Sequence, residues 1–340
     1  MLDLAGKTRE VLKKPRETAK RTENDSSPER SVQQAAFSGG KKPRELVVIS
    51  GKGGTGKTSI AASFAALAHK TLISDCDVDA ADLHLILRPR VKQKGTFSGG
   101  VSVEIDPDRC TACGRCMEAC GFSAVSRTVN GDGKAVYSID AITCEGCGVC
   151  MLVCEEGAIR TEDAINGEWY ISVTRFGPMS HAKLGVAEEN SGRLVSLVRD
   201  KAWKLANEYG ISEELIDGSP GTGCPVIASL TGADYALIVT EPTVSGIHDM
   251  ERVFDVTRHF NIPAGVVVNK YDLNARMTER IKDLTRQKGC EFMGTVPYDG
   301  SVTRAQMKKL SVVEYEDGPV TQSIKDIWRK VAARTDMARR

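Results

Sequence analysis

The 340-residue chain carries 46 Lys and Arg against 45 Asp and Glu, so its net charge of +1 indicates neither a nucleic-acid ligand nor an acidic partner. Its length exceeds the usual range of a single domain, which predicts one large domain and a small one. No apolar run is long enough to cross a bilayer, and the N-terminus lacks the apolar core of a signal peptide. We therefore expect a cytoplasmic protein without a transmembrane segment, and we expect neither nucleic-acid binding nor peripheral membrane contact.

Residues 1–44 are polar, are interrupted by prolines and contain more Lys and Arg than Asp and Glu, which predicts a disordered basic arm. From residue 45 onward, short β-branched runs alternate with amphipathic stretches. This alternation predicts an α/β domain with a parallel sheet covered by helices on both faces. The expected strands cover residues 46–49, 71–74, 214–216, 235–240 and 264–268, and the expected helices cover residues 57–69, 191–208, 246–260 and 275–288.

A phosphate-binding motif follows the first expected strand. The sequence GKGGTGKTS matches G-x4-G-K-[ST] and opens the first expected helix. Backbone N–H groups of such a loop wrap the phosphates, its lysine neutralises the β and γ oxygens, and its threonine binds Mg²⁺. The expected ATP-binding residues are Gly51, Gly53, Gly54, Thr55, Gly56, Lys57, Thr58 and Ser59, and Thr58 is also an expected Mg²⁺ ligand.

Two cysteine ladders interrupt the α/β pattern within residues 96–162. Each ladder reads C-x2-C-x2-C-x3-C, and each cysteine of the second lies 34 residues after its counterpart, so the ladders are an internal repeat. In bacterial ferredoxins with this spacing, three close thiolates hold one cluster and the fourth binds the other cluster. The expected [4Fe–4S] ligand sets are Cys110, Cys113, Cys116 and Cys154 for one cluster, and Cys144, Cys147, Cys150 and Cys120 for the other.

The alternative for these ladders is a pair of zinc knuckles or a disulfide scaffold, because paired C-x2-C units also bind zinc. A tetrahedral zinc site needs four cysteines, and paired C-x2-C units do not include a third cysteine at the same spacing. The spacing therefore favours iron–sulfur clusters. The proline that usually follows the fourth ferredoxin cysteine is replaced by Gly121 and Glu155. We expect an inserted α+β ferredoxin module with two [4Fe–4S] clusters, in a reducing compartment.

The second lysine of the phosphate loop, Lys52, makes the loop resemble the deviant Walker A motif of MinD/ParA/Mrp-type ATPases. In that family this lysine reaches the nucleotide of a dimer partner. The resemblance therefore implies a nucleotide-dependent homodimer, or a heterodimer with a paralogue. The ATPase domain would be discontinuous, formed by residues 45–95 and 163–335. The segment SDCDVDAADLHL resembles switch I of the family, in which Asp77 would position the attacking water.

Three further segments carry this resemblance. IDGSPGTGCP resembles switch II, with Asp217 in the Mg²⁺ shell and Gly221 offering its N–H to the γ-phosphate. VNKYD resembles the base-recognition loop through Asn269 and Lys270, and Pro297 resembles the second wall of the adenine pocket. The cofactors implied are ATP and Mg²⁺. The catalytic residues implied are Lys52, Lys57 and Asp77.

As a whole, the chain resembles MinD-superfamily P-loop ATPases that contain an inserted ferredoxin domain. This resemblance implies an ATP-hydrolysing iron–sulfur protein that couples dimer switching to electron transfer toward an unknown redox partner. An iron–sulfur cluster carrier is an alternative, although Cys224 and Cys290 do not form the C-x2-C pair of Mrp-type carriers. A MinD-like positioning ATPase is the third possibility.

Two smaller features leave alternatives open. Ile324, Ile327, Trp328 and Val331 form an apolar stripe at helical spacing, which would either pack on the sheet, as we expect, or contact a membrane. Cys76, between two acidic residues of switch I, is either a redox sensor or, as is more common, a small buried hydrophobe.

Overall fold

The computed structural model describes residues 42–68, 70–185, 191–335 and 337. The expected basic arm therefore lies outside the described residues except for its last three, residues 42–44. Of these, Arg44 already begins the first strand of the sheet.

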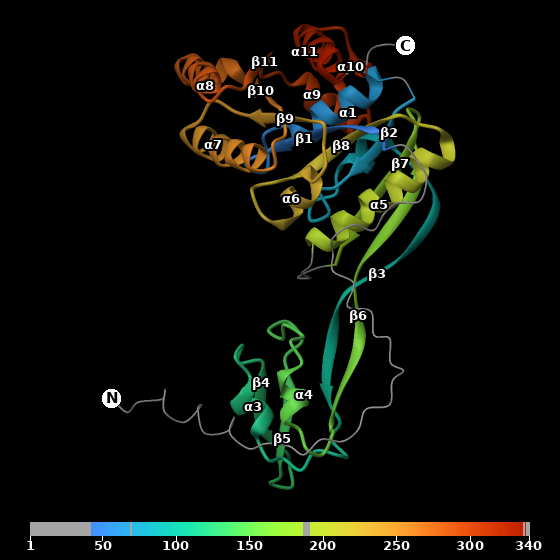
Figure 1. Cartoon of the computed structure of the whole chain (residues 1–340), viewed down its shortest axis with the longest axis vertical. Coiled ribbons are helices and arrows are strands. Elements are labelled where there is room, and N and C mark those ends of the chain that lie inside the picture. The colour runs from blue at the N-terminus through green and yellow to red at the C-terminus, as the bar shows by residue number, and fades with distance from the viewer. Residues whose placement is uncertain (1–41, 69, 186–190, 336, 338–340) are drawn as a thin grey trace, which may run out of the picture. The chain divides into compact units, whose positions relative to one another are not determined.

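A nine-stranded sheet forms the centre of the described chain, in the order β11-β10-β9-β1-β8-β2-β7-β6-β3 (Figure 1). Neighbouring strands are parallel from β11 to β7, and the last two strands continue the sheet in antiparallel pairing. The α/β fold with a mostly parallel sheet is thus confirmed. The parallel strands are β1 (Arg44–Ser50), β2 (Leu72–Asp75), β7 (Pro178–Leu184), β8 (Glu213–Pro220), β9 (Tyr235–Thr240), β10 (Ala264–Asn269) and β11 (Glu291–Val296).

Helices cover both faces of this sheet because its central strands are apolar on both sides. Leu46 and Val48 of β1 belong to one buried core, which includes α1 and α11. Val47 and Ile49 belong to the opposite core, which includes α5, α7 and α8. The helices are α1 (Lys57–Leu67), α2 (Leu83–Leu87), α5 (Ser191–Tyr209), α6 (Cys224–Leu230), α7 (Val244–His259), α8 (Ala275–Gln287), α9 (Ser301–Met307), α10 (Val312–Tyr315) and α11 (Pro319–Thr335), with a 3₁₀ turn η1 (Tyr271–Leu273).

The apolar stripe on α11 packs on the sheet, as expected. Ile324, Ile327 and Val331 are buried in the same core as Phe64 of α1, and the rings of Phe64 and Trp328 lie 5.0 Å apart. The stripe therefore offers no face for membrane contact. No helix in the described ranges is both long and apolar enough to cross a membrane.

The long antiparallel ribbon of β3 (Arg90–Ile105) and β6 (Ile159–Val173) was not predicted from the sequence. Its hydrogen-bonded pairing runs, with three register shifts, from Arg90 opposite Val173 to Ile105 opposite Ile159. The C-terminal half of β6, residues 167–173, also pairs with β7. Both domain boundaries expected at residues 95/96 and 162/163 fall inside these strands, so a continuous ladder joins the two parts of the chain.

The segment between the two ribbon strands, residues 106–158, is called the cysteine module below. It contains α3 (Arg115–Ala119), β4 (Val125–Val129), β5 (Ala135–Ile139) and α4 (Val149–Val153). Its two halves repeat at the offset of the cysteines: Gly114 and Gly148 precede the two helices with φ of 80° and 73°. The module has its own small core, in which cysteine side chains pack with Val103, Val125 and Ile159.

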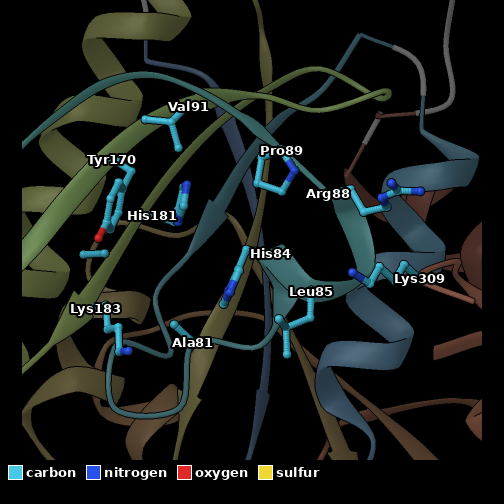
Figure 2. A pocket seen from close by; sticks show the side chains of 11 residues that line it. Ala81, His84, Leu85, Arg88, Pro89, Val91, Tyr170, His181, Lys183 and Lys309 are labelled. Atoms are coloured by element: carbon cyan, nitrogen blue, oxygen red, sulfur yellow. The ribbon is translucent and has the colours of Figure 1, made fainter. Parts of the chain in front are cut away.

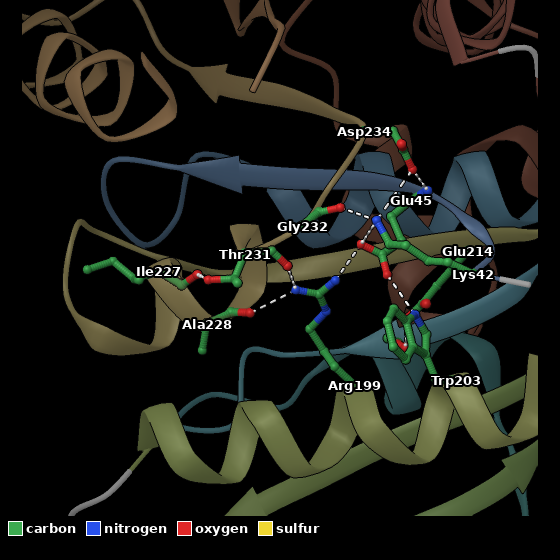
Figure 3. Close-up of polar contacts among 11 residues, drawn as sticks. Lys42, Glu45, Arg199, Trp203, Glu214, Ile227, Ala228, Thr231, Gly232 and Asp234 are labelled. Atoms are coloured by element: carbon green, nitrogen blue, oxygen red, sulfur yellow. Dashed lines mark hydrogen bonds and ion pairs between the residues drawn. The ribbon is translucent and has the colours of Figure 1, made fainter. Parts of the chain in front are cut away.

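A buried charged network ties α5 to β1 (Figure 3). Glu45 is fully buried and pairs with Arg199, while the indole nitrogen of Trp203 donates to Glu45 at 3.0 Å. Glu214 is also fully buried and accepts a hydrogen bond of 2.6 Å from Ser74. Charges inside a core are tolerated when they are paired and hydrogen-bonded in this way.

Candidate functional site

The phosphate loop connects β1 to α1 at the carboxyl edge of the sheet, where open α/β sheets bind their ligands. Two of its glycines are required by close contacts. A Cβ at Gly51 would overlap the backbone of Asp249, and a Cβ at Gly56, which has a φ of 88°, would overlap the amide of Asn269. Gly53 and Gly54 have open space in front of them, as a loop that wraps a ligand requires.

Three switch carboxylates surround the ammonium of Lys57. Its Nζ lies 2.7 Å from Asp217 Oδ1 and 3.2 Å from Asp77 Oδ2, and the ammonium is almost wholly buried. Burial opposes the charge of this lysine, but Asp217 and Asp77 outweigh burial and raise its pKa. Burial, followed by the nearby charge of Asp217, raises the pKa of Asp75 well above its usual range. The sequence-predicted Lys57, Asp77 and Asp217 therefore form one cluster.

This cluster contains more carboxylates than ammonium groups, and some of its oxygens have no hydrogen-bond partner. Within the described residues, Asp75 Oδ2, Asp77 Oδ1, Asp217 Oδ2 and Thr55 Oγ1 are buried without a hydrogen-bond partner. Buried polar atoms are rarely left unpaired, so these oxygens suit a hydrated divalent cation. No three His, Cys, Asp or Glu side chains of the described residues converge on one metal ion. A Mg²⁺ site needs no such group, because Mg²⁺ keeps several waters and takes other ligands from phosphates.

Lys52 is held by a residue that the sequence analysis did not identify. Its Nζ lies 2.6 Å from Glu241 Oε1 and 3.1 Å from Ser245 Oγ. Glu241 also pairs with Lys270 at 3.3 Å, and these two lysines lower its pKa against the effect of burial. One signal for Glu241 was present in the sequence: like Asp217, it is a carboxylate at the carboxyl end of a predicted apolar strand.

The expected base-recognition residues contact the phosphate loop itself. Asn269 donates to the Thr55 carbonyl at 2.8 Å, and Lys270 donates to the Gly54 carbonyl at 3.1 Å. Pro297 directly follows β11, and the next residue in the chain is tied to Asp272 by a 2.7 Å hydrogen bond. The β10 and β11 loops are thereby joined beside the phosphate loop.

The remaining nucleotide-site residues are engaged within the chain. The N–H of Gly221 donates to the Ser50 carbonyl at 2.8 Å, so in this conformation it does not point freely toward a phosphate. Thr58 Oγ1 lies 3.4 Å from the Lys57 ammonium, and Ser59 Oγ accepts a hydrogen bond from Gln306.

Cys76 is fully buried and burial raises its thiol pKa, so it is a core residue and not an exposed redox sensor.

The first expected cluster set shares one cavity in the cysteine module. Cys110, Cys113, Cys116 and Cys154 all line it, together with Tyr137 and Ile159 from the small core. The backbone N–H of Ala158 donates to Cys154 Sγ at 3.3 Å. Backbone hydrogen bonds at Arg115 also lower the pKa of the Cys113 thiol. This donor set, thiols with N–H groups directed at sulfur, fits an iron–sulfur cluster.

The second expected set repeats this arrangement in part. The backbone N–H of Ala124 donates to Cys120 Sγ at 3.4 Å, the counterpart of the Ala158 bond 34 residues later. Cys120, Cys144 and Cys150 all pack against the module core, and Cys147 is exposed. All eleven cysteines are free, so the disulfide alternative finds no support.

Residues 46–312 match the family model of the CobQ/CobB/MinD/ParA nucleotide-binding domain. The chain belongs to this family. Among CobQ/CobB/MinD/ParA relatives by sequence, the uncharacterized protein MJ0578 of Methanocaldococcus jannaschii is 32% identical over 290 residues, covering 84% of this chain and 96% of its own length. The uncharacterized MJ0579 of the same organism is 27% identical over 302 residues, covering 80% and 92%.

More distant similarities agree with the family assignment. An iron–sulfur cluster carrier protein of M. jannaschii is 23% identical over 159 residues, covering 43% of this chain and 53% of its own length. The structure of septum site-determining MinD from Pyrococcus horikoshii, in complex with Mg-ADP, has a TM-score of 0.54 at 18% identity and covers 88% of this chain and 100% of that one. The cell-division ATPase MinD of Pyrococcus furiosus has a TM-score of 0.52 at 17% identity, covering 85% and 98%. The MinD fold of the nucleotide-binding part is thus confirmed.

Proposed function

We propose that this protein is an ATPase that couples nucleotide-driven dimer switching to electron transfer through two [4Fe–4S] clusters. One observation carries the proposal: Cys154 of the second ladder lines the same cavity as Cys110, Cys113 and Cys116 of the first, the crossed arrangement of a two-cluster ferredoxin. The family assignment supports nucleotide binding by the rest of the chain.

The nucleotide chemistry rests on side chains that already meet. Lys57 exchanges its carboxylate partners for the β and γ oxygens of ATP, while Thr58 and Asp217 hold Mg²⁺. Asp77 lies next to Lys57, where it orients the attacking water. Phosphoryl transfer needs positioning and charge more than covalent help, so this small set is sufficient.

Two contacts supply the switch in this proposal. Lys52 leaves Glu241 and Ser245 and reaches the nucleotide of a partner subunit. Gly221 exchanges the Ser50 carbonyl for a γ-phosphate oxygen. Both exchanges replace an internal partner by a phosphate, so they give the ATP-bound state contacts that the free chain lacks. The partner is a second copy or a paralogue; two relatives in M. jannaschii support the second possibility.

Each cluster, when bound, would supply one-electron transfer. The chain tunes it through the hydrogen bonds at sulfur, from Ala158 to Cys154 and from Ala124 to Cys120. The ribbon of β3 and β6 joins the module to strand β7, which in turn pairs with β2, the strand that ends at Asp75. A continuous ladder of hydrogen bonds therefore connects switch I with the cysteine module.

Free thiols suit a reducing compartment, and we place the protein in the cytoplasm.

The test is an EPR-monitored redox titration of the anaerobically purified full chain, with MgADP and with MgATP. Under the proposal, MgATP shifts the midpoint potential of at least one cluster, and the shift disappears in Lys57→Ala. Lys308→Ala, which removes an exposed lysine, keeps it. Potentials that are the same in both nucleotides would contradict coupling and leave ATP binding and cluster binding as separate functions.

A second candidate is an iron–sulfur cluster carrier, which the similarity to the M. jannaschii carrier protein favours. In that case a cluster must leave the protein. Incubation of the cluster-loaded chain with an apo-ferredoxin acceptor, followed by separation and iron analysis, distinguishes the two functions. Transfer of iron and sulfide to the acceptor supports a carrier, and retention of both supports the redox ATPase.

A further inference from the structure

A second cavity is lined in part by the C-terminal end of the switch I segment and is separate from the phosphate loop and the cysteines (Figure 2). It has a volume of about 640 Å³, within the range of small-molecule sites. Its walls come from α2 and the residues on either side of it, the start of β3, the end of β6, and β7, with one lysine after α9. None of the residues assigned above to ATP, Mg²⁺ or the clusters lines it.

One wall of this cavity is a series of three rings. The rings of Tyr170 and His181 stack with centroids 5.0 Å apart at 20°, and His84 follows with its centroid 6.3 Å from that of His181 at 12°. His181 is buried, and its Nε2 lies 2.9 Å from Ser172 Oγ. Burial, and then the proximity of His84, lower the pKa of His181 to about 4, so its ring is neutral at physiological pH. The wall therefore consists of stacked rings, and its central ring, His181, is neutral and held in place by Ser172.

The rest of the lining is apolar except for three cationic side chains. Arg88, Lys183 and Lys309 line the cavity, and no Asp or Glu does. No carboxylate of the described residues forms an ion pair with any of these three cations. Figure 2 draws Arg88 and Lys309 on one side of the cavity and Lys183 on the other. The cavity therefore has a positive charge that the described part of the chain does not neutralise.

Two of these cationic residues have an uncommon backbone conformation. Arg88 ends α2 with a φ of 48°, and Lys309 follows α9 with a φ of 58°. Non-glycine residues adopt this left-handed conformation rarely and at an energetic cost, and such residues concentrate at functional sites. Glycine or asparagine would satisfy both turns more easily, so the long cationic side chains at these positions call for a reason beyond the turn.

We propose that this cavity binds a small organic anion, in which a carboxylate or phosphate group contacts Arg88, Lys309 or Lys183 and a planar unsaturated body lies against the ring wall. Arginine and lysine recognise such groups through charge-assisted hydrogen bonds. The site adjoins the nucleotide switch: His181 is the strand partner of Asp75, and α2 begins six residues after Asp77. A bound anion would contact the C-terminal part of the switch I segment, where Ala81, His84 and Leu85 line the cavity, and would act as an effector of the ATPase.

Ligand-detected NMR on the full chain tests this proposal. The probes are benzoate for a carboxylate source, phenyl phosphate for a phosphate ester, and inorganic phosphate as an anion without a ring. Saturating MgADP is present throughout, so that probes cannot bind at the phosphate loop. The variants are Arg88→Gln and Lys309→Gln, each measured separately so that a folding defect in one leaves the other informative. Lys308→Gln, which changes the adjacent exposed lysine outside the cavity, is the matched control.

We expect benzoate or phenyl phosphate to bind to the unaltered chain and to Lys308→Gln. The affinity should fall by at least about tenfold in Arg88→Gln or Lys309→Gln, as the loss of a charge-assisted hydrogen bond predicts. Binding of benzoate alone assigns a carboxylate ligand, and binding of phenyl phosphate alone assigns a phosphate ester. The proposal is overturned if no probe binds at millimolar concentration, if all three lysine and arginine variants bind alike, or if inorganic phosphate binds as tightly as phenyl phosphate.

Discussion

Lys52 and Glu241 form an ion pair of 2.6 Å that holds the second lysine of the phosphate loop against its own subunit. The same carboxylate pairs with Lys270, so Glu241 neutralises two lysines at the edge of the nucleotide site. Any contact of Lys52 with a partner subunit must first break this pair. The pair is partly exposed, which limits its value to about 1 kcal/mol.

The variant Glu241→Gln is therefore expected to strengthen the ATP-dependent dimer by up to about fivefold, because Lys52 no longer loses an ion pair on association. Analytical ultracentrifugation with a non-hydrolysable ATP analogue measures the dimer affinity. Glu251→Gln is the control, since Glu251 forms only a long surface pair with Lys288. A weaker dimer in Glu241→Gln would mean that Glu241 positions Lys52 for the partner instead of withholding it.

The variant Lys57→Met should depend on Mg²⁺ for its stability. Without this ammonium, Asp75, Asp77 and Asp217 lie together with no buried cation, and breaking such a buried pair costs about 3 kcal/mol or more. Mg²⁺ should recover a larger part of the free energy of unfolding in this variant than in the unaltered chain. Urea denaturation with and without Mg²⁺ measures the difference. An equal response to Mg²⁺ in both proteins would show that these carboxylates do not bind the ion.

The raised pKa of Glu214 predicts that the folded protein loses stability as the pH rises. Burial, and then the nearby Glu45, raise the pKa of Glu214 from 4.5 to about 7. Between these values the folded chain holds the proton more tightly than the unfolded chain, so this group's contribution to stability is full below the unfolded pKa and is lost as the pH rises toward 7. The variant Glu214→Gln cannot lose a proton. Relative to the unaltered chain, it should gain up to about 3 kcal/mol at pH 8 and little at pH 4.5.

Denaturant midpoints measured from pH 4.5 to about 8 test this prediction. The matched control is Glu208→Gln, which changes an exposed residue of α5. A gain of similar size at both ends of the pH range would point to better packing of the amide, and the raised pKa would then not be the cause.

Single cysteine substitutions test which cysteines bind the same cluster. If the sets are crossed, Cys154→Ser and Cys116→Ser abolish the same EPR signal, because both residues line the first cavity. Cys120→Ser should instead abolish the signal that Cys150→Ser abolishes. Each variant should keep about four of about eight irons. Cys224→Ser, at an exposed cysteine outside the ladders, should keep all of them. Loss of the same signal in Cys154→Ser and Cys150→Ser would show that each ladder binds its own cluster.

The sequence predicted which residues meet at the carboxyl edge of the sheet because each part of the expected nucleotide site is local. A phosphate loop, a switch acid and a loop lysine each follow a buried apolar strand, and parallel strands bring their carboxyl ends to one edge. The strands at residues 46–49, 235–240 and 264–268 are present, with ends that differ by two residues or fewer. In contrast, Glu241 acquires its importance through Lys52 and Lys270, of which Lys52 is distant in the sequence.

The ribbon of β3 and β6 could not be found in the same way. No residue of the first part of β3, residues 90–96, is buried, and this part shows no alternation of apolar and polar residues of the kind that marks a half-buried strand. Its stability comes from pairing across more than fifty residues of sequence. Arg175 is a similar case: after the ribbon it reaches the carbonyl groups of Ile86 and Leu87 and pairs with Glu314, contacts that no local pattern indicates.

The pairing of Arg90 with Val173 also bears on how such a chain can arise. At this point the polypeptide leaves the nucleotide-binding domain and returns to it at adjacent backbone positions. A segment with neighbouring ends can be inserted or deleted in a single genetic event while the strands on either side stay in place. The cysteine module could thus have been acquired whole, and a descendant that lost it would need only a short turn between β3 and β6 to keep its sheet.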